Sequence, residues 1–309
     1  MKANEKRQEY AEKAIRNIAE HPCYNAGAHL YARMHIPIAP ACNIQCNYCN
    51  RKFDCTNESR PGVTSEVLTP GQALERFKDV KSRIETLRVV GIAGPGDALA
   101  DFEKTKKSIQ LIREYDPNIT ICLSTNGLLL PKYAQELYKL NVHHVTVTIN
   151  AVDPEIGKKI YGRVHYEGKV YENGTGAKIL MENQIKGLRQ MANYGAVCKV
   201  NIVMIKGINE HHIKDVVQKA KDNGAYITNI TPLIPVKNTP FENLSAPGHD
   251  EIHAARKESG DIILQMYHCR QCRADAIGML GQDVSLEYRS SPCKAEPLGE
   301  SKEKESAAK

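Results

Sequence analysis

Apolar, β-branched runs alternate with longer amphipathic segments along most of the chain. Short apolar runs are typical of buried strands, and apolar residues three or four positions apart are typical of helices. The strands predicted in this way are residues 35–40, 86–93, 119–125, 144–150, 197–205 and 226–234. The predicted helices are residues 1–20, 70–84, 101–115, 131–140, 177–194, 210–223 and 247–266.

Strands that alternate with helices indicate a mostly parallel sheet with right-handed crossovers. The sequence therefore predicts an α/β fold, a partial or near-complete barrel of the TIM type. Enzymes of this architecture carry their chemistry at the carboxyl ends of the strands. Thr69 before Pro70, and Asp101 before the third predicted helix, are typical helix starts.

The composition changes sharply near the C-terminus. Residues 290–309 are mostly small, charged or proline residues, and Leu298 is their one aliphatic side chain larger than alanine. Such a segment buries too little apolar surface to offset the entropy of ordering it. We expect one domain over residues 1–289, followed by a disordered and dispensable tail.

Overall charge and hydropathy exclude several classes of protein. The 309 residues include 42 Lys and Arg against 36 Asp and Glu, a net charge of +6, with no run of five basic residues. This excess is too weak and too dispersed to predict nucleic-acid binding. No apolar run approaches the ~18 residues that a membrane span needs, and the N-terminus is charged rather than signal-like. The sequence therefore predicts a soluble, cytoplasmic protein.

The ten cysteines are unusual for such a chain. Disulfide frameworks are typical of small secreted domains, whereas a chain of this length buries a core large enough to fold without them. Metal or redox chemistry is therefore the better interpretation.

The most specific motif is Cys42-x3-Cys46-x2-Cys49, which follows the first predicted strand. Zinc sites usually combine two short Cys or His clusters to reach four ligands. Here one loop supplies three thiolates, which would leave one iron of a [4Fe-4S] cluster open to a small molecule. Zinc remains the alternative.

This motif, placed after the first strand of a parallel barrel, resembles the radical S-adenosylmethionine (SAM) superfamily. The resemblance implies that the open iron binds the amino and carboxylate groups of SAM, which the cluster then cleaves to a 5′-deoxyadenosyl radical. It also implies a place for Tyr48 against the adenine and a SAM-binding role for two strand ends. The residues concerned are Gly94, Gly96 and Asp97 after the second strand and Ser124 and Asn126 after the third.

Further candidate ligands lie outside the motif: Cys23, His35, Cys55, Cys122, Cys269 and Cys272. Alternation along the strand places Cys122 on the same face as Ser124. Each residue taken alone is also consistent with a structural role, since an isolated cysteine usually behaves as a small buried hydrophobe. Cys198 is our candidate for such a structural cysteine, and Cys293 stays unassigned.

Three segments together extend the resemblance: HPCYN, the stretch from ARMHIPIAP to NESRPGV, and CRQCRADAIGMLGQD. They resemble the NifB family of nitrogenase cofactor maturases over residues 20–285, in a short, single-domain form. The resemblance implies a lyase-class enzyme that fuses two [4Fe-4S] precursors into an [8Fe-9S-C] cluster, with an extra sulfur and a carbide derived from SAM. It also implies cofactor carrier and scaffold proteins and an electron donor as partners.

The same resemblance implies the ligands of three clusters. Cys42, Cys46 and Cys49 would hold the SAM cluster, Cys23, Cys55 and Cys122 one precursor, and His35, Cys269 and Cys272 the other. Glu58 would act near the precursors as an acid–base group or transient ligand, with an ion pair to Arg60 or Arg51 as the alternative.

Two other functions fit parts of this pattern. One is a different radical SAM maturase with auxiliary clusters, although such enzymes carry most auxiliary cysteines in a C-terminal extension. The other is a non-catalytic iron–sulfur carrier, which would not need the glycine-rich and polar strand ends.

Overall fold

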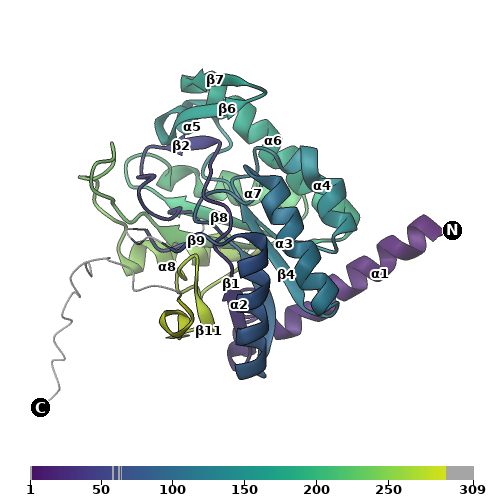
Figure 1. Ribbon diagram of the computed structural model, residues 1–309. Helices are drawn as coiled ribbons and strands as arrows, with labels where there is room; N and C mark the ends of the chain where they lie inside the picture. The colour runs from purple at the N-terminus through teal and green to yellow at the C-terminus, as the bar shows by residue number, and fades with distance from the viewer. Residues whose placement is uncertain (1, 58, 62, 64, 290–309) are drawn as a thin grey trace, which may run out of the picture.

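A computed structural model describes residues 2–57, 59–61, 63 and 65–289 of the chain. Its centre is a curved sheet of nine strands in the order β10-β9-β8-β5-β4-β3-β1-β11-β12 (Figure 1). The parallel strands are β1 (Ala32–His35), β3 (Leu87–Ile92), β4 (Thr120–Thr125), β5 (His144–Thr148), β8 (Val197–Met204), β9 (Ala225–Pro232) and β10 (Leu264–Gln265). β11 (Ile277–Met279) and β12 (Gln282–Asp283) extend the β1 edge in antiparallel pairing. The two outer strands do not pair in the described residues, so the barrel is open.

Helices between the strands cover the outer face of this sheet (Figure 1). They are α2 (Pro70–Arg83), α3 (Phe102–Tyr115), α4 (Leu130–Lys139), α6 (Asn173–Tyr194), α7 (Ile213–Asp222) and α8 (His249–Gly260). The main core lies between the two layers, where outward-facing strand residues such as Val145 and Val200 pack against helix residues such as Ile109 and Leu188. Thr69 and Gln72 form a capping box at the start of α2, as the helix-start signal predicts. The predicted α/β fold is confirmed.

The first strand differs from the prediction. Residues 35–40 were expected to form it, but β1 ends at His35, and Ala39 afterwards makes only an isolated bridge to Pro95. Pro37 and Pro40 have no backbone N–H to donate to a neighbouring strand, so the apolar run continues beside β3 without regular pairing.

A small second sheet was not predicted. It contains β2 (Ile44–Cys46), β6 (Tyr161–Tyr166) and β7 (Lys169–Glu172), and α5 (Pro154–Ile160) leads into it. β2 is formed by the cysteine loop itself, which pairs with β6 in antiparallel register. The hairpin therefore fixes the backbone of the loop from outside the main sheet.

The N-terminal and C-terminal segments both contribute to the barrel interior. After α1 (Lys2–Asn17), the Tyr24 hydroxyl lies 3.4 Å from the carbonyls of Val145 and Val197, near the first residues of β5 and β8. The segment between β10 and β11 contacts this region, because His268 Nε2 bonds the Pro22 carbonyl at 2.9 Å. The two segments thus meet beside the open side of the sheet.

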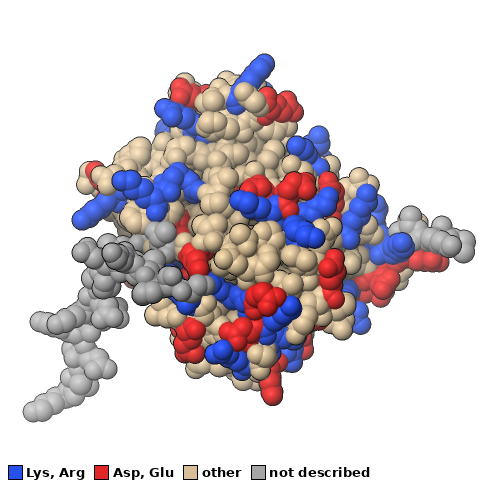
Figure 2. Space-filling model, viewed as in Figure 1, with Lys and Arg blue, Asp and Glu red and all other residues tan. Residues whose placement is uncertain are grey.

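The surface carries charges of both signs. Figure 2 shows Lys and Arg side chains interspersed with Asp and Glu over the visible face. No helix in the described part of the chain is both long and apolar enough to cross a bilayer. The predicted tail, residues 290–309, and the candidate Cys293 within it lie outside the described residues.

Candidate functional site

The thiols of the Cys42-x3-Cys46-x2-Cys49 motif border a small cavity beyond the carboxyl ends of β3 and β4. The other residues lining it are Ile44, Arg51, Cys55, Asn57, Asp97 and Asn126. The Gln45 side-chain amide donates to the carbonyls of Cys46 and Cys49, at 2.9 and 2.7 Å. Together with the β2–β6 pairing, these bonds hold the loop in a shape that gathers its three thiols.

The cysteine side chains lie where burial disfavours the charged thiolate form, so a thiolate here needs a positive charge or an N–H donor nearby. Burial raises the pKa of Cys42 to about 12, and the Asp97 carboxylate adds to this increase. Burial also raises the pKa of Cys46 well above its usual value. Amide groups of Asn126 and Asn57 lie 3.8 Å from the sulfurs of Cys42 and Cys46, respectively. Thiolates with N–H donors beside them are suitable ligands of an iron–sulfur cluster, because its positive irons offset the cost of burying the thiolate charge.

A single metal ion fits this arrangement less well. Among the described residues, no group of three His, Cys, Asp or Glu side chains converges closely enough to hold one ion. A cubane binds its thiolates to different irons and therefore further apart than one zinc ion does. The geometry thus favours the cluster interpretation over the zinc alternative.

The two predicted strand ends meet at this loop. Gly96 N and Asp97 N donate to the carbonyls of Ala39 and Ala41, at 2.5 and 2.7 Å. A Cβ on Gly96 would lie 2.1 Å from the Ala41 oxygen, so only glycine allows this approach. Asp97, which is 2% exposed, accepts bonds from Leu99 N, Thr125 Oγ1 and Asn126 N. The carboxylate therefore joins the two strand ends directly behind the cysteine loop.

Asp97→Asn tests this junction. The asparagine side chain has the same shape, but its amide nitrogen must face either Leu99 N–H or the donors from Thr125 and Asn126. One buried backbone donor then loses its acceptor, so we expect the free energy of unfolding to fall by about 1–3 kcal/mol in urea titrations.

Asp153→Asn is the matched control. Asp153 caps α5 by accepting a bond from Glu155 N at 2.7 Å, a role that asparagine fills equally well. Equal stability losses in the two variants would contradict the proposed role of Asp97.

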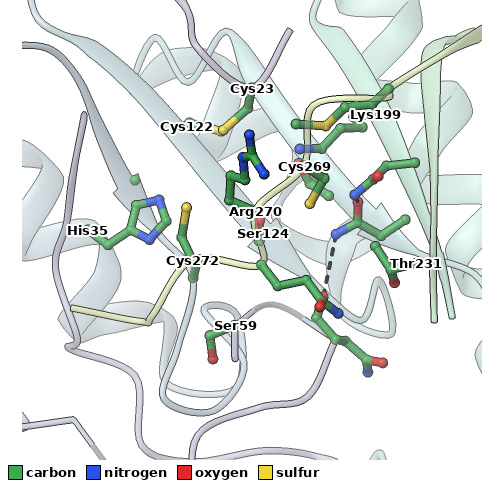
Figure 3. Close-up of a pocket in the computed structure, with 18 of the residues that line it drawn as sticks. Cys23, His35, Ser59, Cys122, Ser124, Lys199, Thr231, Cys269, Arg270 and Cys272 are labelled. Atoms are coloured by element: carbon green, nitrogen blue, oxygen red, sulfur yellow. Dashed lines mark hydrogen bonds between the residues drawn. The ribbon is translucent and has the colours of Figure 1, made fainter. Parts of the chain in front are cut away.

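A second, larger cavity lies inside the barrel next to the first (Figure 3). Five of the predicted ligands line it: Cys23, His35, Cys122, Cys269 and Cys272. Cys122 and Ser124 both face this space, as strand alternation predicts. Ser124 therefore lies in the second cavity, whereas Asn126 lies in the first.

His35 and Cys272 face this cavity (Figure 3), and hydrogen bonds to neighbouring residues orient both side chains. His35 Nδ1 bonds the Arg273 carbonyl at 2.9 Å, which makes Nδ1 the protonated nitrogen and leaves Nε2 with a lone pair. Burial, with the charge of Arg33, lowers the pKa of His35 to about 4, so the ring is neutral near pH 7. Arg33, 2% exposed, donates to Cys272 Sγ at 3.2 Å. A neutral imidazole and a thiolate stabilised by a guanidinium are both suitable iron ligands.

The contacts group the remaining cysteines differently from the expected triads. Cys23 and Cys269 pack against the buried cluster that contains Cys122 and Tyr24. Cys55 instead lines the first cavity, beside the SAM-cluster motif. The division into two triads therefore stays a prediction. Cys198 packs in the main core with Val200, consistent with the structural role predicted for it.

Two other predicted residues need separate comment. Tyr48 is fully buried, and its hydroxyl donates to Asn57 Oδ1 at 2.5 Å and accepts from Asn150 Nδ2 at 2.6 Å. These bonds fix its ring within the cysteine loop, and its contact with adenine stays a prediction. Glu58 lies outside the described residues, so its acid–base role also stays a prediction.

Sequence reasoning missed several polar residues between and around the cavities. Asn57 lines both cavities, and its carbonyl accepts a 3.4 Å bond from Asn201, which in turn accepts from Asn229. Lys199, 6% exposed, lines the second cavity. The signal was available in β8, where Lys199 and Asn201 alternate with Cys198, Val200 and Ile202 and therefore face inward.

The chain matches known protein families. Residues 36–220 match the family model described as the radical SAM superfamily. Three proteins named FeMo cofactor biosynthesis protein NifB, from Chlorobaculum tepidum, Herbaspirillum seropedicae and Klebsiella pneumoniae, are 46%, 49% and 48% identical to the chain. The matches cover 90%, 90% and 89% of the chain but 66%, 54% and 60% of those relatives. The chain therefore spans about half to two thirds of their length.

Solved structures show the same fold at much lower sequence identity. Streptococcus suis SuiB bound to S-adenosylmethionine is 15% identical, with a TM-score of 0.54 over 81% of this chain and 51% of that one. The protein anSMEcpe with bound AdoMet is 16% identical, with a TM-score of 0.53 over 76% of this chain and 61% of that one. These likenesses support the α/β barrel architecture.

Proposed function

The chain belongs to the radical SAM superfamily, and on that premise we propose that it builds an [8Fe-9S-C] precursor of the nitrogenase cofactor from two [4Fe-4S] clusters. In this proposal SAM supplies the carbide and one further sulfur is added. The relatives named FeMo cofactor biosynthesis protein NifB support the assignment, since about nine tenths of this chain aligns with them.

The observation that carries the proposal is the second cavity. Its four cysteines and one histidine lie beside the SAM-cluster motif and exceed what one cluster needs. Together with Cys55, which lines the first cavity, these residues give six further ligands for two substrate clusters. A radical SAM enzyme acting on an organic substrate would need no such concentration of thiols inside its barrel.

In this proposal, the first cavity and the residues next to it bind and orient SAM. Cys42, Cys46 and Cys49 would hold the [4Fe-4S] cluster, which supplies the electron that cleaves SAM. The backbone at Gly94 and Gly96 would hold the SAM amino group. Asp97 would keep the segment of Asn126 in place. Tyr48 would lie against the adenine ring.

The residues of the second cavity hold the two substrate clusters until they fuse. Asn57 forms the partition between the cavities, so carbon transferred from SAM would pass this side chain. Imidazole binds iron less tightly than thiolate does, so His35 would release its iron as the two clusters join. Glu58 would move protons near the same clusters. Cofactor carrier and scaffold proteins and an electron donor are the expected partners.

Iron content and SAM cleavage together test this function. Anaerobically reconstituted protein should bind about twelve irons, because each of three cubanes holds four, and it should release 5′-deoxyadenosine under reducing conditions. A non-catalytic carrier would bind iron without releasing 5′-deoxyadenosine. A fully loaded protein with only four irons would contradict the three-cluster proposal.

Gly91→Ala tests the orientation of His35 without removing a ligand. A Cβ at this position in β3 would lie 2.7 Å from His35 Cδ2 and 3.1 Å from Nε2, so the imidazole must move. We expect the imidazole nitrogen coupling in pulsed EPR to disappear or to weaken severalfold. Gly71→Ala is the control, since a Cβ there meets no atom within 4 Å. An unchanged coupling in Gly91→Ala would show that His35 Nε2 does not bind iron.

A further inference from the structure

A basic cavity lies on the outer side of the barrel, away from the cysteines. It has a volume of about 460 Å³ and forms between α1 and the segment that connects α4 to β5. Its lining residues are Lys6, Glu9, Tyr10, Lys13, Tyr138, Lys139, Asn141 and His143. Because His143 directly precedes β5, the cavity lies at the amino ends of the strands, opposite the SAM-binding strand ends.

The charges around this cavity are not balanced. Lys6, Lys13 and Lys139 line it, and the Arg113 guanidinium adjoins it by donating to the Asn141 carbonyl at 2.6 Å. In the part of the chain that the structure describes, none of these four cations forms an ion pair, and Glu9 is the single acidic residue in the lining. Lys6 and Lys139 are exposed and Lys13 is half-buried, so their flexible side chains can turn toward an anion bound in the cavity.

Two buried nitrogen atoms nearby have no hydrogen-bond partner. His143 is 1% exposed, and its Nδ1 has no partner. Arg113 Nε is also buried without a partner, although its terminal nitrogens bond the carbonyls of Pro117 and Asn141. Buried polar atoms without partners are rare in folded proteins. Of these two residues His143 lines the cavity, so its Nδ1 indicates a place where a ligand oxygen would bind.

Aromatic rings form one wall of the cavity. The Tyr10 ring lies between His143 and Tyr138, with ring centroids 4.4 and 4.8 Å away, respectively. The Tyr10 hydroxyl donates to the Val142 carbonyl, which fixes the ring. The wall is therefore held in place beside the lysines.

We propose that this cavity binds a phosphate-bearing small molecule of up to nucleotide size. Its volume lies within the usual range for small-molecule sites. Lysine and arginine are the usual partners of phosphate, and the ring wall suits a planar group attached to it. The site is independent of the iron–sulfur chemistry, since it lies on the other side of the sheet.

Calorimetry on the full chain, with saturating SAM to block the first site, tests the proposal. Pyrophosphate, inorganic phosphate and AMP serve as probes. Lys13→Met combined with Lys139→Met should weaken pyrophosphate binding by about tenfold or more, because two charge-assisted contacts are lost. His143→Phe, which keeps the ring contact with Tyr10, should also weaken binding.

Lys107→Met combined with Lys132→Met is the matched control, since both lysines are exposed on α3 and α4 and neither lines the cavity. It removes the same net charge and should bind pyrophosphate as the wild type does. AMP bound more tightly than phosphate would identify a nucleotide site, and equal affinity would identify a phosphate site. Equal losses in the two double variants, or no binding of any probe, would overturn the proposal.

Discussion

Replacing Cys42, Cys46 and Cys49 together with alanine is expected to abolish SAM cleavage completely. The three thiols lie in one loop whose backbone is held by β6 and the Gln45 amide, and Cys55, which lines the same cavity, supplies only one thiol in their place. The variant should also lose about a third of the iron, because one of three cubanes disappears. Iron and sulfide analysis, with chromatographic detection of 5′-deoxyadenosine, measures both effects.

Cys198→Ala provides the control for this experiment. Cys198 is fully buried in the core between the sheet and the helices, away from both cavities. Its removal should cost some stability and leave the iron content and SAM cleavage unchanged. If the triple variant still cleaves SAM, these cysteines do not hold the SAM cluster.

His35→Ala is expected to separate SAM binding from substrate-cluster binding. The imidazole lines the second cavity, whereas the cysteine motif lines the first, so SAM should still perturb the EPR signal of its own cluster. The nitrogen coupling of a protein imidazole should disappear, and one substrate cluster should be lost more readily on dilution. Carbide-cluster formation should fall by at least about tenfold, the effect that loss of one ligand and its oriented contacts commonly has.

His165→Ala is the matched control for this variant. His165 is an exposed histidine of β6 and lines neither cavity. It should leave the coupling and the iron content unchanged. A coupling that persists in His35→Ala would assign the nitrogen signal to another residue and would overturn the assignment of His35.

Periodicity predicts the main sheet well because its strands are buried on both faces. β4, β5 and β8 are rich in β-branched and apolar residues, and the helices between them carry one apolar face each. The small β2–β6–β7 sheet was missed, since its strands are short and partly exposed and β2 pairs with β6 across more than a hundred residues. Such pairing depends on tertiary contacts that a local pattern does not contain.

The candidate site was predictable to a similar extent. Motif spacing identifies Cys42, Cys46 and Cys49, and resemblance supplies the other ligands. Neither identifies Arg33, whose bond to Cys272 joins residues 239 positions apart, or the asparagines that separate the two cavities. These are the residues that orient ligands, and their partners are set by the fold rather than by neighbours in the sequence.

The pairing of β1 with β11 also determines when the cluster cavity can exist during synthesis. Arg33 pairs with Gly278, and Met34 with Ile277. The β11 side of β1 can therefore be paired only after almost the whole described chain has been synthesised. A ribosome-bound intermediate that already contains β1 to β9 would have the SAM loop but would lack Cys269 and Cys272. On the proposed ligand assignment, the thiols that complete the second cavity are synthesised last, and a nascent chain that ends before them would hold fewer irons than the full chain.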